Sequence, residues 1–459
     1  MLFVYNSYIF SYEYNWILPE MSLYSNNAVF YGYSFAIEDF YHIFDWTAFD
    51  GAPRARFLSN FFLIINSKLR FLLFDYFPFI HTFSLTWIIT LFNPIILFYI
   101  LKKNNFSFYA SIFTSLLFIY SIAYLGSLNL YFHPAKPLAI TFFLLSILLN
   151  YHLKYSLVNL LENKFFYLLL LLYFFGFFLD ESCFFMPLLS IVILRNILFK
   201  NISSLVIFSI PAFLFFIIIL FVIPQLTNNF LNLEFNLFKW AVSSNDNLVI
   251  SFSFFKNFFS NLYYLFFNNV FYLNSYKVYE INFSYLVITL SVILLSLNSI
   301  KNNKLFYFEN LLFFIFFIFF QTILLTRHNQ VLFDNFYYGG PAAIFLLLFF
   351  IPSIIDTNVI QFFKFEVTIK VFLCVYLLFI SFNNYEKVSN AWRGNSGESN
   401  FLYFDDYFEY WALRKEPLLI NYFKDNHPNI RLRYYLKELY LSSIKPKVLL
   451  TKPYSPVKE

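Results

Sequence analysis

One stretch of this sequence reads Ser203-Ser-Leu-Val-Ile-Phe-Ser-Ile-Pro-Ala-Phe-Leu-Phe-Phe-Ile-Ile-Ile-Leu-Phe-Val-Ile-Pro224, and it contains no charged residue. About 20 apolar residues in a helix are enough to cross the ~30 Å hydrocarbon core of a bilayer. The rest of the chain has a matching composition, because 60% of its 459 residues are hydrophobic and only 12% are charged. Soluble domains carry about 25% charged residues. We therefore predict an integral membrane protein.

Nine further apolar runs are bounded by charges or by Pro and Asn turns, as membrane-spanning helices are. We expect an all-α, polytopic transmembrane helix bundle of about 10–11 spans. It would occupy residues 82–382, between an outward loop over 1–81 and an extramembrane tail over 383–459. The ten expected spans are Thr82–Leu101, Phe106–Leu125, Pro137–Leu153, Phe165–Leu179, Phe184–Leu198, Ser203–Pro224, Phe283–Leu297, Leu305–Leu325, Gly340–Ile355 and Val367–Phe382.

Two other stretches mix apolar residues with charges and Asn, which favours helices that lie on the membrane surface. They are Arg56–Phe77, in the first outward segment, and Asn247–Leu273, within the long loop Gln225–Ile281.

Basic residues in the short loops predict the orientation, because Lys and Arg are retained on the cytoplasmic side. If the Lys102–Lys103 loop is cytoplasmic, alternation places ten Lys and Arg residues on that side and five on the other. The segment before Thr82 then faces outward, which calls for a preceding span. Met1–Leu18 could insert despite its polar residues, or a helix could precede it. The predicted location is a bacterial plasma membrane, with the active face extracytoplasmic.

The first outward segment carries an acidic pair, Glu38 and Asp39, among aromatic residues, and a basic pair, Arg54 and Arg56. Carboxylates near lipid are costly to desolvate and suit a general base or a metal ligand. Arginines at headgroup level suit a phosphate. The alternative is that these residues are ordinary loop charges and snorkelling side chains.

A second acidic pair, Asp180 and Glu181, joins two apolar runs with almost no loop between them. Charges held so near hydrocarbon are functional candidates, although Asp also serves in turns. Arg327 and His328 follow a very apolar run, and Lys136 precedes another. The predicted orientation places all of these residues on the outward face.

The acidic pair of the first loop, the Gly51-Ala-Pro-Arg-Ala-Arg-Phe-Leu-Ser-Asn run and the Asp180–Glu181 turn together resemble the GT-C superfamily of polytopic membrane glycosyltransferases. The likeness is to enzymes related to protein mannosyltransferases and to bacterial glucosyltransferases that use lipid-phosphate sugars. It implies that Asp39 or Glu38 is the catalytic base. It also implies that cations neutralise the donor phosphate, namely Arg327, Lys136, Arg54 and Arg56.

The resemblance further implies a polyprenyl-phosphate sugar donor and a glycan, lipid or protein acceptor. Asp180, Glu181 and His328 would position the acceptor or a metal, and a divalent cation is a possible cofactor although no spacing establishes a site for it. The small net charge of +5 gives no indication of nucleic-acid binding. Two alternatives are a transporter or flippase for a lipid-linked or anionic solute, and a structural subunit of a membrane complex. The near absence of charge inside the spans argues against ion-coupled transport.

Overall fold

The computed structural model describes residues 56–73, 85–119, 135–156, 159–231, 252–264 and 304–326, together with Ile43, Ile344, Pro352, Val371 and Val375. These parts of the chain are predominantly helical and contain no strand. The α-helices are α3 (Phe57–Leu73), α4 (Leu85–Thr90), α5 (Asn93–Lys103), α6 (Phe108–Ile119), α8 (Ala135–Lys154), α9 (Lys164–Phe177), α10 (Met186–Ile193), α11 (Arg195–Leu198), α12 (Ile202–Ile217), α13 (Ile223–Leu226), α15 (Phe252–Tyr264) and α17 (Lys304–Thr326). Short 3₁₀ segments, η4 (Leu160–Glu162) and η5 (Glu181–Phe185), and π-helical segments, η6 (Ile218–Val222) and η7 (Thr227–Leu231), complete the elements.

Helices occupy seven of the ten predicted spans and both predicted surface stretches. The predicted spans Phe283–Leu297, Gly340–Ile355 and Val367–Phe382, and the tail over 383–459, lie outside the described residues or touch them only at single positions. By length and composition, two helices are able to cross a membrane: Ala135–Lys154 and Ile202–Asn229. The helical class is therefore confirmed for the described residues. The number of crossings stays a prediction.

Two of the expected spans are not single helices. The first is divided into α4 and α5, because Pro94 lacks an amide proton and its ring clashes with the carbonyl four residues earlier. The backbone N–H groups of Leu91 and Phe92 close the end of α4 with hydrogen bonds to Ile88 and Ile89. The second is divided into η5, α10 and α11.

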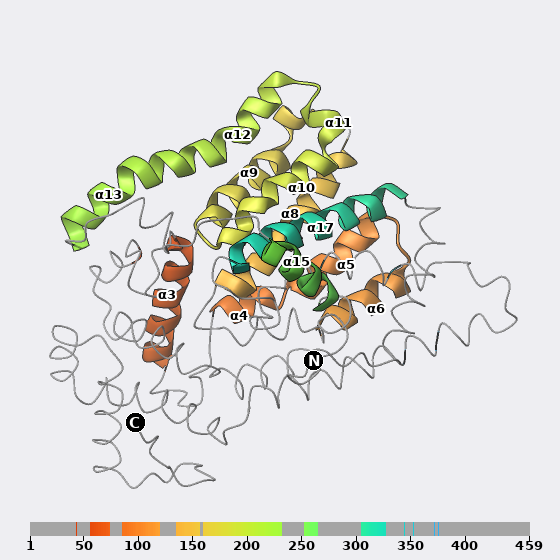
Figure 1. The fold of residues 1–459 in the computed structure, drawn as a ribbon, viewed down its shortest axis with the longest axis horizontal. Helices are drawn as coiled ribbons and strands as arrows, with labels where there is room; N and C mark the ends of the chain where they lie inside the picture. The colour runs from red at the N-terminus through yellow and green to blue at the C-terminus, as the bar shows by residue number, and fades with distance from the viewer. Residues whose placement is uncertain are drawn as a thin grey trace, which may run out of the picture.

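The longest helix of the described residues, Ile202–Asn229, packs its α12 part against α9 and extends as an arm toward α13 (Figure 1). Only 22% of its most apolar window is buried. Among its exposed side chains are Phe213, Phe216 and Phe221. So large an apolar surface is unusual on a soluble monomer, whereas lipid covers it without cost. The arm is the strongest structural sign of a membrane environment in the described part of the chain.

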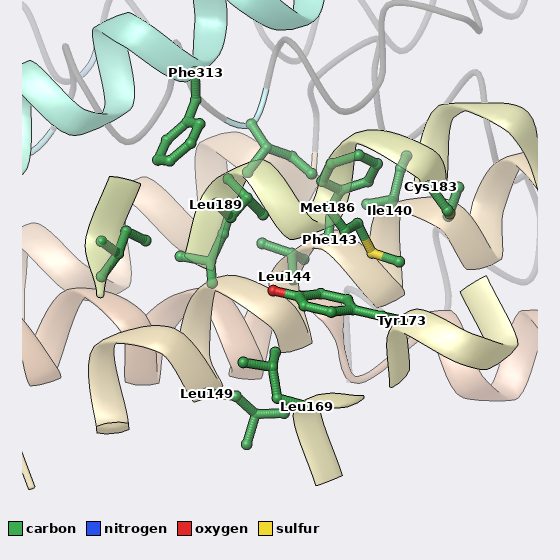
Figure 2. Packing of buried hydrophobic residues seen from close by; sticks show 14 of the residues in the cluster. Ile140, Phe143, Leu144, Leu149, Leu169, Tyr173, Cys183, Met186, Leu189 and Phe313 are labelled. Atoms are coloured by element: carbon green, nitrogen blue, oxygen red, sulfur yellow. The ribbon is translucent and has the colours of Figure 1, made fainter. Parts of the chain in front are cut away.

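Helix α8 lies at the centre of the packed region, in contact with α4, α5, α9 and α10. It buries 15 of its 20 residues, as expected of a helix that is apolar on all sides. Figure 2 shows the core around it, where Phe143 and Leu144 of α8 lie near Tyr173 of α9 and Met186 of α10. Phe313 brings α17 into the same core.

A small polar network crosses this core. The Tyr173 hydroxyl lies 2.6 Å from Ser190 Oγ, 3.2 Å from Ser146 Oγ and 3.1 Å from Asn150 Nδ2. Ser190 Oγ donates to Asn150 Oδ1 at 2.6 Å. Breaking any of these hydrogen bonds would leave a polar group without a partner in an apolar interior, which is costly. The bonds therefore fix the relative position of α8, α9 and α10.

Gly176 is needed where α9 meets the following segment. A Cβ atom there would overlap Met186 Cε and would lie 3.3 Å from Cys183 Cβ. The methionine end can move, but the Cys183 contact is close to the backbone of η5. We therefore expect Gly176→Ala to destabilise the fold by about 1–3 kcal/mol, measured as a lower unfolding midpoint in mild detergent. Unchanged stability would show that η5 shifts freely.

Candidate functional site

Four charged residues from three separate segments meet at one end of the packed helices, and we call them the four-charge cluster. Arg56 directly precedes α3, and Lys136 lies in the first turn of α8. Asp180 is the N-cap of η5, and Glu181 is its first residue. Lys136 Nζ is 2.7 Å from Asp180 Oδ2. Arg56 Nη2 is 2.6 Å from Glu181 Oε2 and 3.7 Å from Asp180 Oδ2. Arg56 Nε also donates to both oxygens of Glu181, at 3.2 and 3.1 Å.

Local structure explains how the acidic pair is held. Helix α9 ends at Phe177. Asp180 has an extended backbone conformation and is the N-cap residue of η5. Asp180 Oδ1 accepts hydrogen bonds from the backbone N–H of Ser182 at 3.0 Å and from its hydroxyl at 2.6 Å. This is the N-cap role for which Asp is favoured. One carboxylate oxygen thus serves the turn while the other faces the cations.

The start of α3 is attached to the same turn. The backbone N–H of Leu58 donates to the carbonyl of Phe178 at 2.9 Å. The rings of Phe57 and Phe178 pack with their centroids 5.9 Å apart. These contacts position Arg56 beside the acidic pair. The predicted surface stretch Arg56–Phe77 is therefore attached to the bundle at its first residue.

The cluster is buried, and its charges balance. Asp180 is 1% exposed, Arg56 and Lys136 are nearly as buried, and the Glu181 side chain is 31% exposed. Burial by itself raises the pKa of Asp180, which lies in the turn between helices. The charges of Lys136 and Arg56, with hydrogen bonds from Lys136 and Ser182, outweigh burial and hold that pKa below its usual range.

The arrangement assigns different chemical capacities to the two acids. Both oxygens of Asp180 are occupied inside the protein, so Asp180 is suited to position Lys136 and Arg56. The Glu181 side chain is 31% exposed while Arg56 binds its carboxylate, so it is the more accessible of the two acids. Two cations held at a fixed spacing by carboxylates are also a preorganised environment for developing negative charge.

The other predicted site residues lie outside the described part of the chain: Glu38, Asp39, Arg54, Arg327 and His328. Their assignment as base and as phosphate ligands stays a prediction. Among the described residues, no group of three or more His, Cys, Asp or Glu side chains is arranged to hold a metal ion.

A second charged cluster was not predicted. Glu309 of α17 is buried and lies 3.0 Å from Lys154 Nζ and 3.9 Å from Arg195 Nη1. The Tyr151 hydroxyl donates to Glu309 at 3.1 Å. A lone carboxylate in an otherwise apolar 23-residue helix is the signal that could have indicated it.

The two clusters lie at opposite ends of α8. Lys136 and Lys154 are 18 residues apart in one helix, so they are separated by about 27 Å along its axis. This is close to the thickness of the hydrocarbon core. The loop after α5 lies at the Lys154 end, where the Tyr155 hydroxyl donates to Asn104 Oδ1 at 3.2 Å. Among the described residues, the four-charge cluster therefore lies at one end of α8, and Lys154 with the loop after α5 lies at the other.

Comparison with known protein families, with curated proteins and with solved structures finds no match for this chain.

Proposed function

We propose that the chain is a polytopic membrane glycosyltransferase that moves a sugar from a polyprenyl-phosphate donor to an acceptor at the extracytoplasmic face. The observation that supports it is the four-charge cluster, in which distant segments bring two acids and two cations together at one end of α8. Buried ion pairs add little stability to a helix bundle, because the cost of desolvating the charges offsets much of their mutual attraction. Four charges gathered in one place therefore favour a functional role. The membrane boundary is also where a lipid phosphate would lie.

In the proposed reaction, the acceptor hydroxyl attacks the anomeric carbon of the donor sugar. Its proton passes to Asp39 or Glu38, the bond between the anomeric carbon and the phosphate oxygen breaks, and polyprenyl phosphate leaves as the anion. Lys136 and Arg56, assisted by Arg327 and Arg54, neutralise that leaving group. Asp180 holds the cations in place, and Glu181, with His328, positions the acceptor or a divalent cation.

The experiment uses the full chain, purified and reconstituted in lipid, with a panel of polyprenyl-phosphate hexoses. Release of polyprenyl phosphate is the readout, because attack by any acceptor hydroxyl, including that of water, frees the same leaving group. We expect the double variant Glu38→Gln/Asp39→Asn to reduce release by about 100-fold or more. Lys256→Gln, a change at an exposed lysine of α15, is the control and should match wild type. Full activity in the double variant would overturn the catalytic assignment.

A transporter of a lipid-linked or anionic solute is the second candidate, and the break between α4 and α5 favours it. Asn93 begins α5 and is fully buried, and neither its Nδ2 nor its Oδ1 has a hydrogen-bond partner. It lies ten residues before Lys103, or about 15 Å along the helix, which is half the thickness of the hydrocarbon core. Discontinuous helices with unsatisfied polar groups at mid-depth form binding sites in transporters.

Flux of polyprenyl-phosphate sugar across proteoliposomes separates this candidate from the enzyme. If the chain is a transporter, the donor moves across the membrane without release of polyprenyl phosphate. This movement is then lost in Asn93→Leu but not in Glu38→Gln/Asp39→Asn. Transfer predicts the reverse pattern for the two variants.

A further inference from the structure

The Lys154 end of the helices concentrates exposed positive charge, and we call it the basic end. Six cations lie there, contributed by the ends of α5 and α8, the start of α9, α11 and the residue before α12: Lys102, Lys103, Lys154, Lys164, Arg195 and Lys200. The described acidic residues of this end are Glu162 and Glu309. Within the described residues, these six cations and two acids sum to a charge of +4, whereas the four residues of the four-charge cluster sum to zero.

Contacts between segments show that these cations share one surface. Lys154 and Arg195 meet at Glu309. The His152 ring packs edge-on against Phe165, with centroids 4.4 Å apart, and Lys164 Nζ lies 5.6 Å from the centre of the same Phe165 ring. The Tyr155 hydroxyl, directly after α8, donates to Asn104 Oδ1, directly after α5, at 3.2 Å. The ends of α5, α8, α9 and α11 are thus joined by contacts between side chains.

The positive charge is available at the surface. Glu309 is buried and takes up the charge of Lys154. Lys102, Lys164 and Lys200 are exposed, and Lys103 is half-buried. Within the described residues, none of these four lysines has a carboxylate at ion-pair distance. In the described part of the chain, these four ammonium groups are therefore not paired with a carboxylate, and three of them are exposed.

Amphipathic aromatic side chains accompany the lysines. Tyr155 follows Lys154, Tyr167 lies in the first turn of α9, and Tyr109 lies in the first turn of α6, and all three are exposed. The Tyr167 hydroxyl donates to the carbonyl of Leu161 at 2.8 Å, which holds the ring at the helix end. Tyrosines at this position mark the headgroup level of a membrane protein. Lysines and tyrosines therefore occur together at this end, as they do at the headgroup level of membrane proteins.

We propose that the basic end is a binding surface for the headgroups of anionic phospholipids. Clusters of Lys and Arg at a membrane boundary attract anionic lipids, and the attraction increases with each added charge. This inference requires only that the chain resides in a membrane, so it stands independently of glycosyl transfer.

The test reconstitutes the full chain in nanodiscs of mixed phosphatidylcholine and phosphatidylglycerol, extracts it in nonionic detergent and measures the lipid retained by each variant. We expect wild type to retain phosphatidylglycerol in preference to phosphatidylcholine. Replacing Lys102, Lys103, Lys164 and Lys200 with Gln should reduce that preference by about tenfold or more. Lys256→Gln is the matched control, since it removes an exposed lysine from α15, which packs against the second half of α17 through Phe254 and Phe319.

A second variant, Lys103→Gln/Lys164→Gln/Lys200→Gln, retains Lys102, whose Nζ also donates to the carbonyl of Phe106 at 3.1 Å. This triple variant preserves the end of α5, and it should still lose most of the preference for phosphatidylglycerol over phosphatidylcholine. An equal preference in wild type and in both variants would overturn the proposal, and so would an equal loss in Lys256→Gln. Displacement of the lipid by inorganic phosphate would also overturn it, because the surface would then recognise the bare anion. Persistence of the lipid in excess phosphate supports it.

Discussion

Lys136→Met is expected to destabilise the folded chain by about 3–5 kcal/mol, because it leaves the buried carboxylate of Asp180 without its nearest cation. Asp180 is 1% exposed, and Lys136 Nζ lies 2.7 Å from its Oδ2. Arg56 remains, but at 3.7 Å it is beyond hydrogen-bond distance.

The double variant Lys136→Met/Asp180→Asn is the matched control. Asn keeps an oxygen that can accept from Ser182, so the N-cap of η5 is preserved. The uncompensated charge is removed, and we expect most of the lost stability to return. Unfolding in mild detergent, followed by near-UV circular dichroism, measures the series. If the double variant is as unstable as Lys136→Met, packing by the lysine stem would be the cause, and the ion-pair explanation would be wrong.

The pH dependence of the same series follows from the lowered pKa of Asp180. A carboxyl group whose pKa is lower in the folded state stabilises the fold at every pH above its unfolded pKa of about 3.9. This contribution is lost as the pH falls toward the folded value. The difference in stability between wild type and Lys136→Met/Asp180→Asn should therefore be constant from about pH 5 to pH 8 and should shrink only in stronger acid.

Much of the helical layout was predictable from apolar runs, because such runs in lipid can satisfy their backbone only as helices. The helices α8, α9, α12 and α17 each lie where a run predicts them. The break between α4 and α5 was not predicted, although Pro94 is visible in the run. Hydropathy reads only the apolar content of a segment, and a proline changes the backbone without changing that content.

The candidate site was predicted as a set of residues on one face, and not as a set of contacts. The loop charges placed Arg56, Lys136, Asp180 and Glu181 on the same side, but which cation meets which acid depends on the neighbours of α8. Glu309 shows the converse. No role was predicted for it, and the packing of α17 beside α8 and α10 buries it against Lys154. Pairings between distant helices are set by tertiary packing, which hydropathy does not encode.

Lys154→Met should destabilise the chain more than Glu309→Gln does, although the two changes remove the same ion pair. The Glu309 side chain is 1% exposed, and that of Lys154 is 16% exposed. Removing the lysine leaves a buried carboxylate whose remaining cation, Arg195, is 3.9 Å away, so we expect a loss of about 3–5 kcal/mol. Removing the carboxylate leaves an ammonium that can turn toward the lipid boundary on its flexible stem.

Glu309→Gln also keeps an oxygen that can accept the hydrogen bond from the Tyr151 hydroxyl. Its expected cost is therefore about 1 kcal/mol, the ordinary value of one hydrogen bond. The double variant Lys154→Met/Glu309→Gln should recover most of the stability of Glu309→Gln. Chemical unfolding of the three variants in the same detergent measures the difference. Equal costs for the two single variants would mean that Glu309 reaches water, which would contradict its burial.

The same variants separate stability from function, because Lys154 is about 27 Å along α8 from the four-charge cluster. Release of polyprenyl phosphate per folded molecule should match wild type in Lys154→Met and fall in Lys136→Met. Both changes remove a lysine that pairs with a buried carboxylate, and both lysines belong to the same helix, so each variant is destabilised by the loss of one ion pair. A loss of release confined to Lys136→Met would therefore assign the chemistry to the Lys136 end, and an equal loss in both would assign to the four-charge cluster only a role in folding.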